Sequence, residues 1–159
     1  MALILIVDDE SGIRDMLGAV LEADGHRVRS VDSAQKGLSE LSNGWFDLII
    51  TDLSMPEMNG VEMLKHVSET GAEIPSIVIT AYGSKETAIE AMRLGAVNYV
   101  EKPFDVEEMK IHVRRALEQR QMAEENRQLR ARLSVSAELI GSSPAIQRVR
   151  GMIERVNAY

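Results

Sequence analysis

The stretch Asp47-Leu-Ile-Ile-Thr-Asp52-Leu-Ser-Met-Pro-Glu57 is a short apolar run that ends in a carboxylate directly before a turn. Continuous apolar, β-branched runs of this length are typical of parallel strands buried on both faces. Similar runs at residues 3–7, 76–79 and 99–100 are also followed by polar side chains: Asp8, Asp9 and Glu10, then Thr80, then Lys102 before Pro103. The chain therefore repeats one unit, a buried strand with a polar carboxyl end.

Segments with helical periodicity separate these apolar runs. The first of them places Ile13, Met16, Leu17, Val20 and Leu21 on one face and stops before Gly25. Strands are also predicted at residues 28–31, 46–51, 74–80 and 97–100, and helices at residues 34–41, 60–67, 85–94 and from the N-cap Asp105 onward. These βα units predict an α/β fold over residues 1–117, with a doubly wound five-stranded parallel sheet of flavodoxin-like strand order 2-1-3-4-5.

The carboxyl ends of the strands carry the candidate chemistry. Taken singly, Asp8 also fits a cap of the first helix, Thr80 a strand-end hydroxyl and Lys102 a solvated surface charge. Ligands of doubly wound sheets bind outside this edge, where the strand order reverses. The joint placement of these residues at one edge therefore predicts a single site.

The acidic residues of this site predict a metal ion. Clustered carboxylates repel one another unless a cation lies among them, and oxygen ligands favour a hard cation such as Mg²⁺. An ion of this kind commonly bridges to a phosphoryl group. In that chemistry Asp52 is the nucleophile, Lys102 supplies positive charge, and Thr80 donates its hydroxyl to a phosphoryl oxygen.

Four motifs resemble the receiver domain of bacterial two-component response regulators, over residues 3–117. They are Val7-Asp8-Asp9-Glu10, Asp52-Leu-Ser-Met-Pro-Glu-Met-Asn-Gly60, Ile79-Thr80-Ala81 and Glu101-Lys102-Pro103-Phe104. The resemblance implies that Asp52 is the phosphoacceptor and that Mg²⁺ binds Asp8, Asp9, Asp52 and the Ser54 backbone carbonyl, with Asp9 the more direct ligand of the acidic pair. It also implies a switch pair, Thr80 and Tyr99, and a cis bond between Lys102 and Pro103.

Composition and charge limit the cellular location and the partners that the sequence predicts. The chain has no cysteine, no apolar stretch near the ~20 residues of a membrane span, and no signal peptide, which predicts a cytoplasmic protein without membrane contact. Residues 1–117 contain 11 basic and 20 acidic residues, for a formal charge of −9, whereas residues 118–159 carry +2. An acidic domain repels phosphate backbones, so we expect no direct nucleic-acid binding by this chain.

The predicted fifth helix continues past residue 117 into a linker at residues 118–136. Met122, Asn126, Leu129 and Leu133 follow 4-3-4 spacing there, which favours a two-stranded coiled coil and a homodimer through helix five and the linker. The alternative is a solvated linker helix with an incidental apolar stripe. Residues 134–137 are expected to end the helix.

Residues 137–159 contain a new helix start, with Ser143 as N-cap and Pro144 at the first helical position. This segment resembles the opening of the AAA+ ATPase domain in sigma-54-dependent transcription activators of the NtrC family. The resemblance implies a chain truncated at the start of that domain, with the ATPase activity absent.

The sequence as a whole predicts a regulatory domain and not an enzyme. By its resemblance, it accepts a phosphoryl group from a histidine kinase on Asp52 and controls dimer packing, and so the activity of a downstream AAA+ domain. Two alternatives remain open. One is an interaction module that works without phosphorylation, and the other is a Mg²⁺-dependent aspartyl phosphohydrolase, in which Ser54 would stand where such enzymes place a second aspartate.

Overall fold

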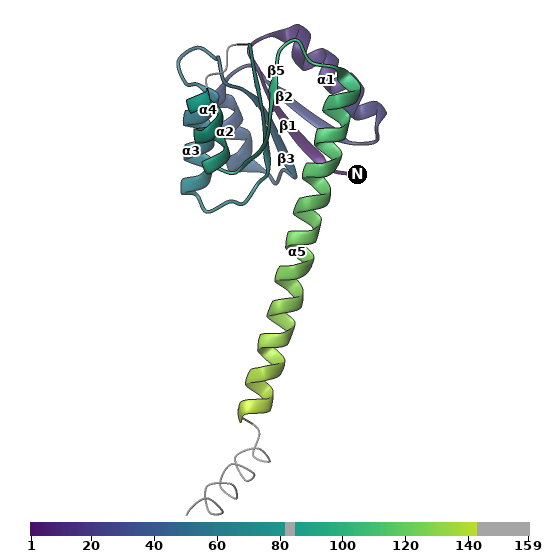
Figure 1. Cartoon of the computed structure of the whole chain (residues 1–159), viewed down its shortest axis with the longest axis vertical. Coiled ribbons are helices and arrows are strands. Elements are labelled where there is room, and N and C mark those ends of the chain that lie inside the picture. The colour runs from purple at the N-terminus through teal and green to yellow at the C-terminus, as the bar shows by residue number, and fades with distance from the viewer. Residues whose placement is uncertain (82–84, 143–159) are drawn as a thin grey trace, which may run out of the picture. The chain divides into compact units, whose positions relative to one another are not determined.

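The computed structural model describes residues 1–81 and 85–142, and it has the predicted α/β architecture (Figure 1). All strand pairings are parallel, and the sheet order is β2-β1-β3-β4-β5. The elements are β1 Leu3–Val7, α1 Ser11–Ala23, β2 Arg27–Val31, α2 Ala34–Asn43, β3 Leu48–Asp52, α3 Gly60–Glu69, β4 Ser76–Thr80, α4 Lys85–Arg93, β5 Ala96–Glu101 and α5 Val106–Ser142. The predicted fold class and strand order are confirmed.

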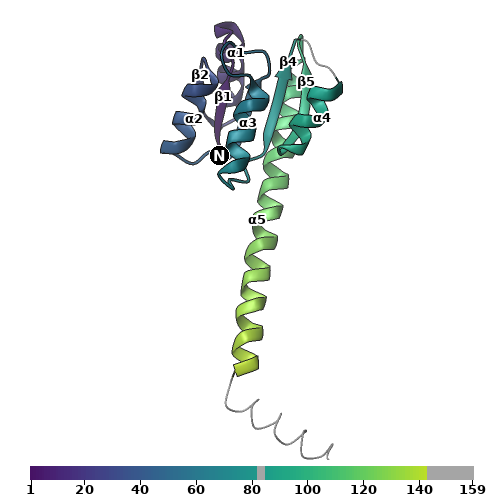
Figure 2. The ribbon, with the colours of Figure 1, turned by 90° about the vertical axis from the view of Figure 1, so that its left-hand side faces the viewer.

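Helices cover both faces of the sheet, as Figures 1 and 2 show from two sides. On one face, Leu17 and Leu21 of α1 and Met109 and Val113 of α5 pack in one buried cluster with side chains of the central strands. On the other face, α2, α3 and α4 contribute to two further clusters. Side chains of β1, β3 and β4 are buried almost throughout, which explains why these strands are continuously apolar in sequence.

Local side-chain bonds fix several of the helix starts. Asp105 Oδ1 accepts the backbone N–H groups of Glu107 and Glu108 at 2.8 and 3.1 Å, so the predicted N-cap of α5 is confirmed. Asn59 and Glu62 form a reciprocal capping box at the start of α3. These caps set where each helix leaves the polar edge of the sheet.

Helix α5 is longer than predicted. The chain divides into two compact units, residues 1–120 and 121–159, and α5 continues through the predicted break at residues 134–137 to Ser142. That prediction was wrong, because serine and valine weaken a helix only slightly and alanine favours one, and the first residues that disfavour a helix strongly are Gly141 and Pro144. The predicted helix start at Ser143 lies outside the described residues.

None of the helices in residues 1–81 and 85–142 is both long enough and apolar enough to span a membrane.

Candidate functional site

Three buried polar residues end neighbouring strands of the sheet. Asp8 follows β1, Asp52 ends β3 and Thr80 ends β4, and each is at most 3% exposed. The strand register places Asp52 beside Ile79, and Thr80 beside Glu101 of β5, directly before Lys102. The predicted gathering of these residues at one sheet edge is therefore what the fold produces.

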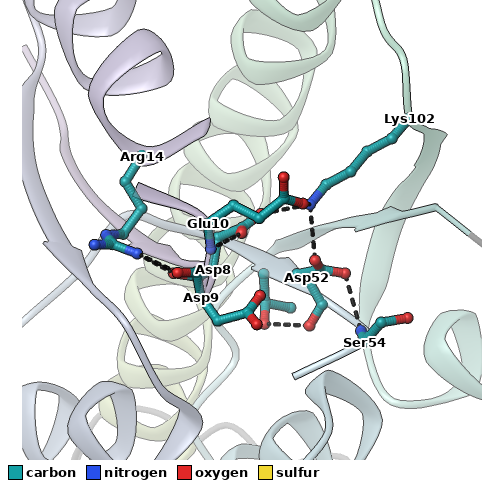
Figure 3. Close-up of polar contacts among 8 residues, drawn as sticks. Asp8, Asp9, Glu10, Arg14, Asp52, Ser54 and Lys102 are labelled. Carbon is teal, nitrogen blue, oxygen red and sulfur yellow. Dashed lines mark hydrogen bonds and ion pairs between the residues drawn. The ribbon is translucent and has the colours of Figure 1, made fainter. Parts of the chain in front are cut away.

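Lys102 is the centre of the site. Its Nζ atom donates hydrogen bonds to Asp52 Oδ2 at 2.8 Å and to Glu10 Oε1 at 2.7 Å, and it lies 3.0 Å from Asp8 Oδ2. Figure 3 shows the lysine side chain reaching over Asp52 toward Glu10. Three carboxylates thus share one ammonium group, whose side chain is only 10% exposed.

Backbone groups orient the carboxylates. The N–H of Ser54 donates to Asp52 Oδ1 at 2.9 Å, and the N–H of Glu10 donates to Asp8 Oδ1 at 2.8 Å. The Arg14 guanidinium binds the carbonyl oxygens of Asp8 and Asp9, which ties the strand end to α1 (Figure 3). These bonds hold both buried carboxylates at fixed positions before any ligand arrives.

Burial and ion pairing perturb two groups of the site. Burial raises the pKa of the Asp8 carboxyl above its ordinary value, although the Glu10 N–H and Lys102 act in the opposite direction. For Lys102, burial favours the neutral amine, but the contacts with the Asp52, Glu10 and Asp8 carboxylates outweigh it and raise the pKa of Lys102 well above the ordinary value. Lys102 is therefore held charged, whereas Asp8 lacks a fully compensating partner.

The site has the donor set of a hard cation. One ligand oxygen each from Asp8, Glu10 and Asp52 lie within 4.8 Å of one another. Asp8 Oδ2 is buried and makes no hydrogen bond among the described residues, although it lies at ion-pair distance from Lys102. A buried carboxylate oxygen without a hydrogen bond fits a position where a metal ion completes the coordination, so Asp8 and Asp52 fit Mg²⁺ as ligands.

The family described as response regulator receiver domain matches residues 4–114. The chain belongs to that family. Receiver domains generally bind Mg²⁺ in an acidic pocket at this edge of the sheet, in agreement with the carboxylate cluster described above.

Relatives of this receiver place it among NtrC-family sigma-54 regulators. The regulatory protein AtoC of Escherichia coli K12 is 37% identical over 149 residues, which cover 92% of this chain and 32% of AtoC. The chain spans about a third of the length of the curated relatives it matches.

Solved structures agree with this placement. NtrX from Brucella abortus has a TM-score of 0.77 at 32% identity and covers 98% of this chain and 34% of its own. The beryllofluoride-activated NtrC4 receiver domain dimer has a TM-score of 0.72 at 32% identity, over 76% of this chain and 99% of its own.

The two residues expected to form the switch pair lie on neighbouring strands of the receiver. Thr80 is fully buried, and its carbonyl accepts the Lys102 N–H at 2.8 Å. Tyr99 packs with the cluster that includes Leu64 and Ala91, and its buried hydroxyl has no hydrogen-bond partner among the described residues. The Lys102–Pro103 bond is cis, as the family resemblance implied.

Asp9 and Glu10 occupy different places from those the motif alone suggested. Asp9 is exposed and lies outside the group of three clustered carboxylates, whereas Glu10 belongs to it. The sequence identifies Glu10 as one of the acidic residues at the end of the first strand but assigns it no contact. Its position in the acidic run 8–10 is the only sequence feature that points to the site. The role of Asp9 as a metal ligand stays a prediction.

Replacing Asp8 with asparagine is expected to raise the free energy of unfolding of the metal-free receiver by about 1 kcal/mol at neutral pH. Because burial raises the Asp8 pKa, the folded state holds this proton to higher pH than the unfolded state does. The contribution of Asp8 to stability is thus greatest below its ordinary pKa of 3.8 and falls as the pH rises through the folded-state value.

Urea unfolding with a chelator present, at several pH values, measures this effect. The Asp8→Asn variant should be more stable than the parent chain at pH 7. Between pH 4 and neutrality, its stability should fall less than that of the parent chain. A variant less stable than the parent at pH 7 would mean that the Lys102 ion pair outweighs the burial of Asp8.

Proposed function

We propose that this chain is a phosphorylation-dependent switch in which Asp52 accepts a phosphoryl group from a histidine kinase. The single observation that carries this proposal is the environment of Asp52. Its carboxylate is buried at the end of β3 and is bonded to the Ser54 N–H on one oxygen and to the Lys102 ammonium on the other. Such an arrangement positions a carboxylate nucleophile and places positive charge beside it.

In the proposed reaction, an Asp52 oxygen forms the new bond to phosphorus as the bond from phosphorus to the histidine nitrogen of the kinase breaks. Asp52 attacks as a carboxylate, so it needs no general base. The Lys102 ammonium stabilises the negative charge on the phosphoryl oxygens, and the Thr80 hydroxyl, at the end of the adjacent strand, donates to one of them.

Asp8, Asp9, Asp52 and the Ser54 backbone carbonyl would hold Mg²⁺ in this proposal. When bound, Mg²⁺ supplies positive charge to the equatorial phosphoryl oxygens. The buried Asp8 Oδ2, which makes no hydrogen bond among the described residues, supports the inclusion of Asp8 in this set. Ser54 lies beside the nucleophile through its backbone, and its side chain offers no carboxylic acid for the general-acid step of an aspartyl phosphohydrolase.

The switch pair would report phosphorylation to the rest of the receiver. Movement of the Thr80 hydroxyl toward the phosphoryl group vacates space near β4, and the Tyr99 ring turns into it. The buried Tyr99 hydroxyl, which has no hydrogen bond among the described residues, supports a ring that can exchange one position for another at little cost. The readout surface in this proposal is α4, β5 and α5.

We assign the receiver to residues 1–117, the linker to residues 118–136 and the start of an AAA+ domain to residues 137–159. The linker would form a coiled-coil homodimer, since Met122 and Leu129 are 63% and 56% exposed in a single chain. The side chain of Leu133 lies outside the described part of the structure. Dimerisation of the NtrC4 receiver supports the same behaviour here. The proposal places the protein in the cytoplasm, where it controls the packing and activity of a downstream AAA+ domain.

Replacing Asp52 with asparagine is expected to abolish phosphorylation. Incubation with Mg²⁺ and acetyl phosphate should add the mass of one phosphoryl group to the parent chain and none to Asp52→Asn. Intact-mass spectrometry measures the adduct, and light scattering on the same samples measures any change in assembly. Asp15→Asn is the matched control, because Asp15 is an exposed aspartate of α1.

Two outcomes would contradict the proposal. An adduct that persists in Asp52→Asn would place phosphorylation elsewhere, and an absence of any adduct at all Mg²⁺ concentrations would favour an interaction module that works without it.

A further inference from the structure

Glu10 makes a contact that the proposed reaction does not use. It occupies the N-cap position of α1, yet its side chain makes no capping hydrogen bond there. Its carboxylate instead binds the Lys102 ammonium at 2.7 Å, across 92 positions of sequence, and this distance is the shortest of the three carboxylate contacts of that lysine. The Glu10 side chain therefore binds a distant lysine and does not cap its own helix, which suggests a functional role.

The three carboxylates around Lys102 differ in their access to water. Asp8 and Asp52 have side chains 1% and 3% exposed, whereas that of Glu10 is 60% exposed. Loss of the lysine contact would leave the first two as buried charges without a full partner, which is costly. Glu10 alone of the three can exchange its contact for water, so it is the partner that Lys102 can release.

We propose that Glu10 is a competing partner of Lys102 that slows phosphoryl transfer to Asp52. It accepts the ammonium hydrogen that a phosphoryl oxygen would otherwise accept, and it adds a negative charge beside Lys102, which an anionic donor must approach. Both effects slow phosphoryl transfer to Asp52. Glu10 works through Lys102 and does not touch the reacting atoms, and the inference rests on the proposed function of Asp52.

Charge makes the expected effect measurable. The cluster of Lys102 with Asp8, Glu10 and Asp52 carries a formal charge of −2. Glu10→Gln removes one negative charge, which leaves −1, and keeps the shape of the side chain. Removal of one charge at this range should speed phosphorylation by acetyl phosphate about threefold to tenfold at low salt, and the gain should shrink as salt is added.

The test compares two small donors on the full chain at fixed Mg²⁺. Acetyl phosphate carries more negative charge at neutral pH than phosphoramidate, so Glu10→Gln should gain more rate with the first. A merely structural role would change both rates by the same factor. Glu22→Gln, an exposed glutamate near the far end of α1, loses the same charge and should leave both rates unchanged. Glu10→Asp keeps the charge on a shorter side chain and should give an intermediate rate.

A second readout needs no phosphoryl donor. The ¹⁵Nζ resonance of Lys102, measured with a chelator present, should move in Glu10→Gln and stay in place in Glu22→Gln. Equal or slower phosphorylation of Glu10→Gln, beside a parent chain that does form the adduct, would overturn the inference alone. Absence of the adduct in every variant would overturn the proposed function and with it the rate effect, while the resonance would still show whether the contact exists.

Discussion

Replacing Lys102 with methionine is expected to lower the free energy of unfolding by about 3 kcal/mol at neutral pH in the absence of divalent cations. The substitution keeps much of the aliphatic stem but removes the ammonium that contacts Asp8, Glu10 and Asp52. Two of these carboxylates are buried, and all three have ligand oxygens within 4.8 Å of one another. Without the cation they repel one another in a region that water solvates poorly.

The pH dependence identifies this cause. In Lys102→Met the Asp8 carboxyl, whose pKa burial already raises, loses a contact that lowers this pKa, so the folded chain binds more protons than the unfolded chain above pH 3.8. Stability of the variant should therefore rise as the pH is lowered through that range. In the parent chain the Lys102 pKa is itself raised, so the contribution of the lysine is fully present below its ordinary pKa of 10.5 and is lost only as the pH rises through the folded-state value.

Urea unfolding with and without Mg²⁺ completes the test. Mg²⁺ should recover more stability in Lys102→Met than in the parent chain, because it supplies the missing positive charge. Lys36→Met is the matched control: Lys36 of α2 makes an exposed ion pair with Asp32, and the loss of this pair should cost far less stability. Equal losses in the two variants would show that the carboxylate cluster does not depend on Lys102.

Much of the fold could be predicted because the central strands carry an unambiguous signal. Strands β1, β3 and β4 are buried on both faces, so their residues are apolar almost without interruption, and polar residues mark their ends. The edge strand β2 is exposed at Arg27, Arg29 and Ser30, and the sequence showed it only through Val28 and Val31. Helix α5 is longer than the sequence predicted, because residues 134–137 do not end a helix.

The site could be predicted as a gathering of residues but not as a set of contacts. Topology brings the strand ends together whatever the side-chain conformations, so Asp8, Asp52, Thr80 and Lys102 were placed correctly at one edge. Which carboxylates meet Lys102 depends on rotamers and on the path of the chain after β1. The sequence therefore could not distinguish Glu10, which contacts the lysine, from Asp9, which is exposed.

Replacing Gly60 with alanine is expected to destabilise the receiver by about 3 kcal/mol and to impair phosphorylation of Asp52. A Cβ atom at this position would lie 2.2 Å from the carbonyl oxygen of Asp52, 3.0 Å from its carbonyl carbon and 3.2 Å from the Leu53 Cα. All of these are backbone atoms of the segment that carries the phosphoacceptor, and no rotamer change can move them. The Gly60 N–H also donates to the Leu53 carbonyl at 3.2 Å, so α3 starts directly against this segment.

Space, and not backbone conformation, is the reason for glycine at this position. The positive-φ glycines in the described part of the chain are Gly25, Gly71 and Gly95, and Gly60 is not among them. Gly12→Ala is the matched control, because a Cβ atom there meets nothing within 4 Å inside α1. That variant should gain up to about 1 kcal/mol from the higher helix propensity of alanine.

Thermal and urea unfolding, with intact-mass measurement of the phosphoryl adduct, would compare the two variants. Gly60→Ala should lose stability and adduct formation together, since relief of the overlap must displace the end of β3. Retention of both would mean that α3 can shift away from Asp52 at little cost. In that case the close approach of α3 would serve packing alone, and the position of the phosphoacceptor would depend on the bonds from Ser54 and Lys102.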